Sequence, residues 1–517
     1  MRGAMLKKYA FIGHKQLMWL AGAMLLTFLV SAATHPILSW TGPKAGKHRP
    51  PSAVIKGDHV GNMASVLRKH QIDQALIVKI VPTELGNLLQ VTEDKNVARR
   101  YFDLKTGEEI LDFDQHQAVW LARYYLSKTS SDEIRKVDFI TEFNSAYPWV
   151  NRLLPVYKVQ FADQGNTSAF IYTELNALAS VGNDYKTRMQ AVFRTLHTWS
   201  WLSNFESARL IIMVLLMSTI TLMTLSGIAL LIMIRGRKTM PRRVKFHRGI
   251  AYVVAIPILG FCVSGFYHLL IYGFVDLGLL DKERGMSSPK PINLLPIVTT
   301  RGEFELGQNA LNHISLIDHD GQIYLRASEA VAKNRNSSKL SSAENDEHAH
   351  HAKPRQARER RYEGQSFERH AIYKNLSTTK SHSNLNDKEV VERIATNHTG
   401  FKREELSSSE LITRFGMHYD FRNKRLPVWQ INFDQNGVKL FVDPVSGLVV
   451  DKLVNRDRYE GYSFSLLHKW NFLTPITGRF WRDVLVVIVL TLSLIMMIFG
   501  LATSMKRIKL GSSSIKE

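Results

Sequence analysis

The chain has 517 residues, a formal net charge of +21 and a single cysteine, Cys262. Its length is sufficient for several domains. One cysteine excludes an intrachain disulfide, haem attached through two thiols, a four-thiolate iron–sulfur cluster and a cysteine-rich zinc site. The basic excess does not indicate a nucleic-acid partner, because much of it lies in short segments beside apolar runs, where positive charge reports membrane orientation.

The first apolar run predicts a transmembrane helix over residues 12–36, with His14 and His35 near its ends. Twenty residues separate the two histidines, so a helix places them about 31 Å apart, one near each surface of a bilayer. The basic start and Ser31-Ala32-Ala33 also suit a cleaved signal peptide. A retained helix is favoured, because the chain repeats this arrangement later.

Residues 37–208 contain no apolar span and predict a soluble α+β domain. The periodicity predicts one helix and three strands in it: 115–126, then 137–143, 156–161 and 168–173. A second transmembrane helix is expected over residues 209–234, followed by a basic loop over 235–246.

The third predicted transmembrane helix, 247–274, has the same form as the first, with His247 and His268 near its ends. Residues 275–482 predict a second soluble α+β domain, and residues 484–503 predict a fourth transmembrane helix. The chain is therefore expected to be an α+β membrane protein with four transmembrane helices.

Residues from about 330 to 385 differ in composition from the rest of the second soluble region. They are rich in Ser, Asn, Glu, Lys, Arg and His, which predicts a disordered insertion. His348, His350 and His351 suit a weak metal-binding tract or, more simply, a solvated polar loop.

Basic residues cluster at the N-terminus, in the 235–248 loop and after the fourth helix. If the four helices alternate in direction, all three clusters fall on one side, which the positive-inside bias assigns to the cytoplasm. In a bacterium, the protein would then lie in the inner membrane with both termini cytoplasmic and both large domains periplasmic.

The sequence contains an internal duplication. LPVYKVQF at 154–161 matches LPVWQINF at 426–433, and the Leu-His-x-Trp of 196–199 recurs at 467–470, so the two matches keep almost the same offset along the chain. Two tandem repeats with the same membrane orientation are expected to pack about a pseudo-two-fold axis along the membrane normal. Such an axis brings together three histidine pairs: His14 with His247, His35 with His268, and His197 with His468.

The order of spans, the paired histidines, the Leu-His before spans two and four, and the strand–turn–strand FVDPVSGLVVDKL (441–453) resemble the PepSY-associated transmembrane family. RYFDLKTGEEIL (100–111) is a fainter version of the strand motif. The resemblance implies two periplasmic PepSY-like domains and a haem-containing, inner-membrane reductase of ferric siderophores in iron uptake. The first domain departs from the family pattern, since Tyr172-Thr173-Glu174-Leu175 replaces the usual Asp-Pro-x-x-Gly turn.

Two neutral imidazoles from different helices can bind one b-type haem without covalent attachment. His14 and His247 form the expected cytoplasmic-side pair. Four histidines are candidates for a second haem on the outer side, and His35 with His268 is the preferred pair. His197 and His468 suit haem ligation, contact with haem propionates or a substrate-facing site. The main rival ligand is zinc or copper. Gly227, Gly249, Gly260 and Gly265 suit close approach of haem or close helix packing.

These expectations define a di-haem b electron-transfer protein, an oxidoreductase that reduces a ferric siderophore or other ferric chelate at the periplasmic face. The sequence has no GxGxxG motif, so its electron donor is expected to be membrane quinol or a separate dehydrogenase. No catalytic side chain is identified for the reduction itself. The alternative is a membrane-anchored periplasmic PepSY module that binds or regulates without redox activity.

Overall fold

The structure is a computed structural model that describes residues 2–52, 54–55, 58–234, 240–276, 290–299, 311–329, 371–376, 385–416 and 418–513. The chain forms two compact units. The membrane unit contains residues 1–42, 185–282 and 456–517, and the sheet unit contains residues 43–184 and 283–455.

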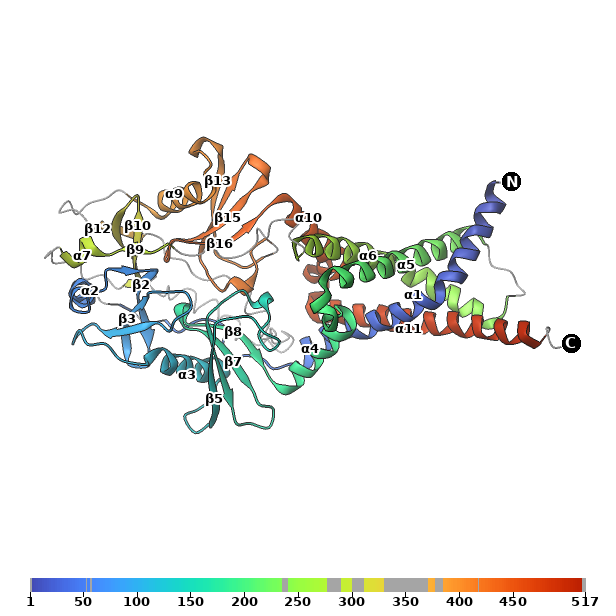
Figure 1. Ribbon diagram of the computed structural model, residues 1–517, viewed down its shortest axis with the longest axis horizontal. Coiled ribbons are helices and arrows are strands. Elements are labelled where there is room, and N and C mark those ends of the chain that lie inside the picture. Colours follow the sequence, from blue (N-terminus) through green and yellow to red (C-terminus); the bar gives the residue numbers. More distant parts are fainter. Residues whose placement is uncertain are drawn as a thin grey trace, which may run out of the picture. The chain divides into compact units, whose positions relative to one another are not determined.

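Among the described residues, four helices of the membrane unit are long and apolar enough to cross a bilayer (Figure 1). They are α1 (Arg2–Thr41), α5 (Glu206–Met233), α6 (Arg242–Asp276) and α11 (Thr474–Ser513). The expectation of an α+β membrane protein with four such helices is confirmed.

Three of these helices, α1, α6 and α11, extend at both ends beyond the predicted segments 12–36, 247–274 and 484–503. Once a helix has begun, each further residue adds a backbone hydrogen bond, so it continues past the apolar run into polar flanks. The predicted loop 235–246 is correspondingly shorter, because α6 begins at Arg242; residues 235–239 lie outside the described part. Within α11, Gly478 interrupts the helical backbone with φ 72° and ψ 164°.

Within the membrane unit, α1 and α6 each contact both α5 and α11. The helices therefore form a four-membered ring in which α1 and α6 occupy opposite corners. Small and aliphatic side chains from all four helices fill its centre, including Ala21, Ile220, Val254, Ile258 and Leu490.

Short helices precede α5 and α11 along the chain and connect each of them to the sheet strands before it. Their bounds are α4 (Asp184–His197), η3 (Ser200–Phe205), α10 (Asn455–Ser463), the π-helical turn η10 (Phe464–His468) and η11 (Asn471–Leu473). Both Leu-His-x-Trp segments lie here. Trp199 and Trp470 each adopt a left-handed backbone conformation, with φ of 50° and 54°, that turns the chain toward the following helix.

The sheet unit contains a six-stranded sheet with the order β12–β11–β10–β2–β3–β4. Its strands are β2 (Ile77–Thr83), β3 (Gly86–Thr92), β4 (Arg100–Asp103), β10 (Leu311–His319), β11 (Gln322–Glu329) and β12 (Ala371–Asn375). A two-stranded sheet pairs β1 (Gln74–Ala75) with β9 (Ile292–Asn293). Helices α2 (Asp58–Lys69) and α7 (Leu295–Thr299) complete this part of the fold.

The expected division into separate soluble domains, 37–208 and 275–482, needs correction. Strand β2 from the first region pairs antiparallel with β10 from the second, with Lys79 opposite Ser315 and Ile80 opposite Ile314. This pairing satisfies the backbone edges of both strands and joins the two regions into one sheet, on which residues from both regions form a shared hydrophobic cluster.

Two further sheets are four-stranded antiparallel meanders, each confined to one region. The first contains β5 (Ile134–Ile140), β6 (Val156–Phe161), β7 (Ser168–Tyr172) and β8 (Ala177–Gly182). The second contains β13 (Leu406–Ile412), β14 (Val428–Phe433), β15 (Lys439–Asp443) and β16 (Leu448–Leu453). Helix α3 (Phe113–Leu126) packs on the first sheet and α9 (Asp387–Thr399) on the second.

The two meanders share local geometry at the positions that the sequence aligns. A cis peptide bond joins Leu154 to Pro155 and another joins Leu426 to Pro427. Shortly before each, Arg152 and Lys424 have φ of 67° and 61°. The aligned segments therefore adopt the same loop and strand conformation.

The predicted insertion from about 330 to 385 lies largely outside the described residues, as do His348, His350 and His351. Residues 371–375 within it form strand β12, which pairs antiparallel with β11. The prediction of disorder is therefore wrong for residues 371–375. The alternation in Ala371–Asn375 is too short to be recognised without its partner strand.

The turn at residues 173–175, which lacks the Asp-Pro-x-x-Gly form present at 443–447, supplies an ionic contact between the two sequence regions. The β7–β8 hairpin still closes, because Asn176 takes the left-handed conformation (φ 49°) that Gly447 takes in the other meander. Glu174, fully buried, contacts Lys79 Nζ at 2.6 Å and also pairs with Arg425. Burial alone raises the pKa of Glu174, but the cations Arg425 and Lys79 outweigh it and lower that pKa to about 2.

Glu174→Gln is expected to destabilise the folded protein by about 3–5 kcal/mol, because it leaves the buried Lys79 without its carboxylate and removes one of the two carboxylates that contact the buried Arg425. The folded-state pKa lies below the ordinary value, so the stabilisation by Glu174 is complete above about pH 5 and is lost as pH falls toward 2. Thermal unfolding of the detergent-solubilised full chain across this pH range measures both effects. Exposed Glu84, in the β2–β3 turn, provides the control Glu84→Gln, which is expected to change stability little. Equal stability of the two variants would contradict the assignment.

Candidate functional site

Two histidines from opposite corners of the membrane unit approach each other near one end. The ring centres of His14 on α1 and His247 on α6 are 6.3 Å apart. His14 Nδ1 lies 3.1 Å from the carbonyl oxygen of Met223, and His247 Nδ1 lies 2.9 Å from that of Met496. A carbonyl oxygen can only accept, so each Nδ1 carries the hydrogen and each Nε2 of the neutral ring carries the lone pair.

A second pair forms toward the other end of the same unit. The ring centres of His197 and His468 are 6.4 Å apart. His197 Nδ1 lies 2.9 Å from the hydroxyl of Ser31, and His468 Nδ1 lies 3.1 Å from that of Ser264. Each hydroxyl donates its hydrogen to a carbonyl of its own helix and therefore accepts a hydrogen bond from the imidazole Nδ1. The lone pair of each ring is again on Nε2.

The separation between the two levels follows from helix geometry. The interval from His14 to Ser31 on α1 equals the interval from His247 to Ser264 on α6. It amounts to nearly five helical turns, which places the two histidine pairs about 25 Å apart along the bundle. One pair therefore lies near each end of a segment that matches the thickness of a bilayer.

The spacing within each pair suits two imidazoles bound to opposite sides of one metal ion. Imidazole–metal bonds measure about 2.0 Å and each nitrogen lies about 1.1 Å from its ring centre, so such rings have centres about 6.2 Å apart. Hydrogen bonding of the second ring nitrogen to a fixed acceptor is the usual support for a ligating histidine. Both pairs fit this arrangement.

The donor set favours haem iron over a bare ion. Among the described residues, no cluster of three or more His, Cys, Asp or Glu side chains is placed to hold a metal. Two opposed imidazoles complete the coordination of an iron whose other four ligands come from a porphyrin. Zinc requires about four ligands, and each pair supplies two.

Two glycines give His14 and His247 room. A Cβ atom on Gly227 of α5 would lie 3.1 Å from His14 Cε1, and one on Gly500 of α11 would lie 3.2 Å from His247 Cε1. Of the glycines predicted to allow close approach, Gly227 and Gly265 therefore lie beside candidate ligands, since a Cβ atom on Gly265 would lie 3.8 Å from His468 Cε1. Gly249 has nothing within 4 Å of a Cβ position.

The preferred outer pair, His35 and His268, is not the pair that the geometry favours. His35 is exposed, and its ring centre lies 4.4 Å from that of Phe193. His268 Nδ1 contacts Oε1 of the buried Glu460 at 2.5 Å. His197 and His468 are the outer histidines that lie at ligand-like spacing, because α4 and the η10 turn carry them in toward α1 and α6.

A phenylalanine stacks on each histidine of the outer pair. The Phe193 ring lies 4.6 Å from that of His197, and the Phe464 ring lies 4.6 Å from that of His468. These stacks help to bury the two imidazoles. Burial, with added repulsion from neighbouring histidines, lowers the pKa of His197 to about 4 and that of His468 to about 3. Both rings are therefore neutral at physiological pH, as metal ligation requires.

Four residues that hold the histidines or lie beside them were not identified from the sequence: Ser31, Ser264, Gly500 and Glu460. The two serines carried a usable signal, because each stands four residues before the outer histidine of its helix. Gly500 could also have been identified from the sequence, because it occupies the position in α11 that Gly227 occupies in α5. Glu460 could not, since the corresponding position in the first half holds no acidic residue.

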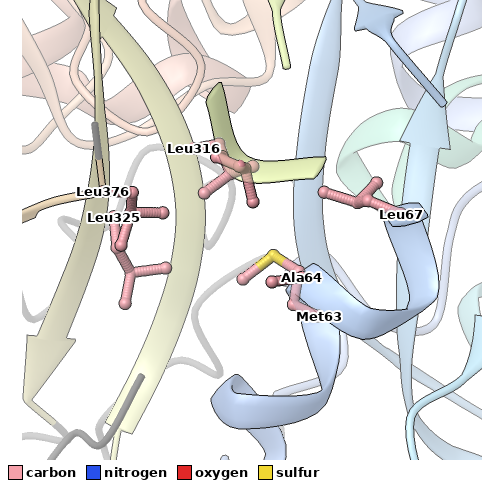
Figure 2. Close-up of a pocket in the computed structure, with 7 residues that line it drawn as sticks. Met63, Ala64, Leu67, Leu316, Leu325 and Leu376 are labelled. Carbon is pink, nitrogen blue, oxygen red and sulfur yellow. The ribbon is translucent and has the colours of Figure 1, made fainter. Parts of the chain in front are cut away.

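The sheet unit contains a small cavity of about 10 Å³ between α2 and the six-stranded sheet (Figure 2). Its lining is entirely apolar and includes Met63, Leu67 and Leu316. A space of this size and polarity has no groups to orient a ligand, so it is a packing void.

Comparison with known proteins gives no assignment for this chain, since no family model, curated protein or solved structure matches it. Its function is therefore inferred from the residues of the membrane unit themselves.

Gly500→Ala is expected to displace the His247 ring, because the added methyl group would stand 3.2 Å from it, and thus to lower haem content at the inner pair. Gly227→Ala is expected to act alike on His14. Haem per chain after detergent purification measures the effect. Gly249→Ala is the matched control on α6 and is expected to retain the wild-type content. Full haem loading in all three variants would contradict the proposed contact.

Proposed function

We propose that this chain is an inner-membrane di-haem b protein that carries electrons to a ferric siderophore or another ferric chelate at the outer face. The observation that carries the proposal is the presence of two histidine pairs with ring centres 6.3 and 6.4 Å apart. Each of the four rings has its Nδ1 tied to a neighbouring group and its Nε2 free for iron.

The proposal includes two tandem pseudo-symmetric repeats of the PepSY-associated type. Support comes from matched partners: His14 and His247 both bond to a methionine carbonyl of the adjacent helix, and Ser31 and Ser264 hold the outer rings alike. A pseudo-two-fold axis along the membrane normal relates such partners. The fold of the sheet unit differs from two independent PepSY-like domains, because it shares the β2–β10 pairing.

We assign the axial ligands as His14 with His247 at the inner level and His197 with His468 at the outer level. His35 and His268 are not assigned as iron ligands in this proposal. The basic segments orient the inner level toward the cytoplasm and both large sequence regions toward the periplasm.

Bound haem would supply a one-electron carrier at each membrane surface. The protein supplies neutral imidazoles, fixes their orientation and excludes water from them. Reduction of Fe(III) to Fe(II) weakens its bonds to hard oxygen ligands, which gives a chemical reason for placing the acceptor at the outer face. The chain carries no nucleotide-binding motif, so the electrons come from membrane quinol or from a separate dehydrogenase.

An optical spectrum of the detergent-purified protein, as isolated and after dithionite, tests the proposal. We expect a Soret band and split α and β bands of low-spin haem, with two haems per chain. His14→Ala, His247→Ala, His197→Ala and His468→Ala are each expected to lower the count to about one, because each pair needs both ligands.

His35→Ala is the matched comparison and is expected to keep both haems. Loss of one haem in this variant, with full loading of His197→Ala, would restore the original outer pair. Folded protein expressed with ample haem that shows no Soret band would overturn the electron-transfer function and favour the anchored binding module. Addition of a ferric siderophore to the reduced protein, with reoxidation followed optically, tests the acceptor.

A further inference from the structure

The two halves of the membrane unit, α1 with α4 and α6 with α10, differ at a place that the haem proposal does not use. In the second half, His268 near the end of α6 contacts Glu460 of α10, with Nδ1 2.5 Å from Oε1. The position in the first half that corresponds to Glu460 is Met189, and the position that corresponds to Tyr272 is Ser39. The position that corresponds to the carboxylate of the His268–Glu460 pair is therefore occupied by an apolar side chain in the first half.

The His268–Glu460 pair is held in place but remains accessible. The Glu460 side chain is 6% exposed, whereas the His268 side chain is 39% exposed although the rings of Phe464 and Tyr272 pack on it with centres 4.5 Å away. The carboxylate accepts a hydrogen bond from Nδ1, which places the ring hydrogen of the neutral form of His268 on that nitrogen. The second nitrogen, Nε2, is then a hydrogen-bond acceptor for an incoming group.

We propose that the His268–Glu460 pair binds the hydroxyl group of a membrane quinol, the electron donor of the proposed reductase; this inference rests on the proposed function. A lone pair on Nε2 selects a ligand that donates a hydrogen bond. Hydroquinone has hydroxyl donors, whereas the oxidised quinone has only acceptors, so the reduced form is the one that binds.

The location suits a lipid-soluble aromatic ligand better than a polar ferric chelate. His268 lies seven residues before Val275, where the membrane-spanning part of α6 ends. Its immediate neighbours are aromatic rings, which pack well against a flat quinol ring.

A continuous stack connects this site to the outer histidine pair. Phe464 stacks on His268 with a ring-centre distance of 4.5 Å and an interplanar angle of 20°, and on His468 with 4.6 Å and 13°. A quinol at His268 is therefore separated from a proposed iron ligand by one phenyl ring.

The chemistry balances with the acceptor already proposed. Oxidation of one hydroquinone to quinone releases two electrons and two protons, and two Fe(III) chelates become two Fe(II). The O–H bonds of the hydroquinone break, and the protons leave by way of His268 and Glu460 to external water. The product quinone lacks a donor for Nε2 and is released.

The test uses the purified full chain in detergent and decylubiquinol as the reductant, with the haem spectrum as the readout. Glu460→Gln and His268→Phe are expected to slow reduction by decylubiquinol at least about tenfold, while haem content and reduction by dithionite stay unchanged. Met189→Gln places the same side chain at the corresponding position of the first half and is expected to keep the wild-type rate.

Photolabelling with an azido-substituted quinol measures binding without relying on turnover. We expect label on peptides containing residues 264–275 and 455–468, reduced in the His268→Phe variant and by excess decylubiquinol. Absence of label there, or equal quinol reduction rates in all variants, would overturn the site. If a ferric hydroxamate prevented labelling of these peptides and decylubiquinol did not, the quinol site would also be overturned, and the result would indicate a site for the ferric acceptor.

The possible outcomes separate this inference from the proposed function. A wild-type protein with two haems that decylubiquinol neither reduces nor labels rejects the quinol site and leaves the di-haem assignment intact. Loss of haem in His268→Phe would make His268 an iron ligand and overturn the inference. Absence of haem from the wild-type protein would contradict the reductase function. It would also remove the role of quinol-binding site that is assigned to His268 and Glu460.

Discussion

The arrangement of the membrane unit depends on the second nitrogen of each half-buried imidazole. In an apolar bundle an unsatisfied N–H costs several kcal/mol, so every ring needs an acceptor at a fixed place. At the inner level, that acceptor is a main-chain carbonyl on the next helix, Met223 for His14 and Met496 for His247. The direction in which each ring presents Nε2 is therefore set by helix packing, which is why glycine stands beside each ring.

The two halves of the chain agree closely where they hold the four paired histidines and differ where a partner molecule could bind. The inner level uses matched carbonyls and the outer level matched hydroxyls. The carboxylate of Glu460 breaks this correspondence at the outer surface. This asymmetry fits the proposed function, in which electrons are accepted at one site and passed on in one direction.

Much of the membrane unit could be predicted from the sequence, because long apolar runs and repeated histidines are local signals. The paired positions His14 with His247 and His197 with His468 followed from the duplication. The choice between His35 and His197 could not be made, because it depends on how α4 and η10 fold back toward the helices. The shared sheet was not predicted for a similar reason. Strands β2 and β10 lie in different halves of the chain, and the residue pattern within a strand does not indicate which other strand it pairs with.

The pairing of β2 with β10 has a consequence for biosynthesis. During synthesis, β3 follows β2 directly and can cover one of its edges. The other edge of β2 stays unpaired until α5 and α6 have been inserted and β10 has been synthesised. During that interval an apolar strand edge is open to incorrect pairing. A chain truncated after α5 would therefore be expected to aggregate or be degraded, because it lacks the strand that covers β2.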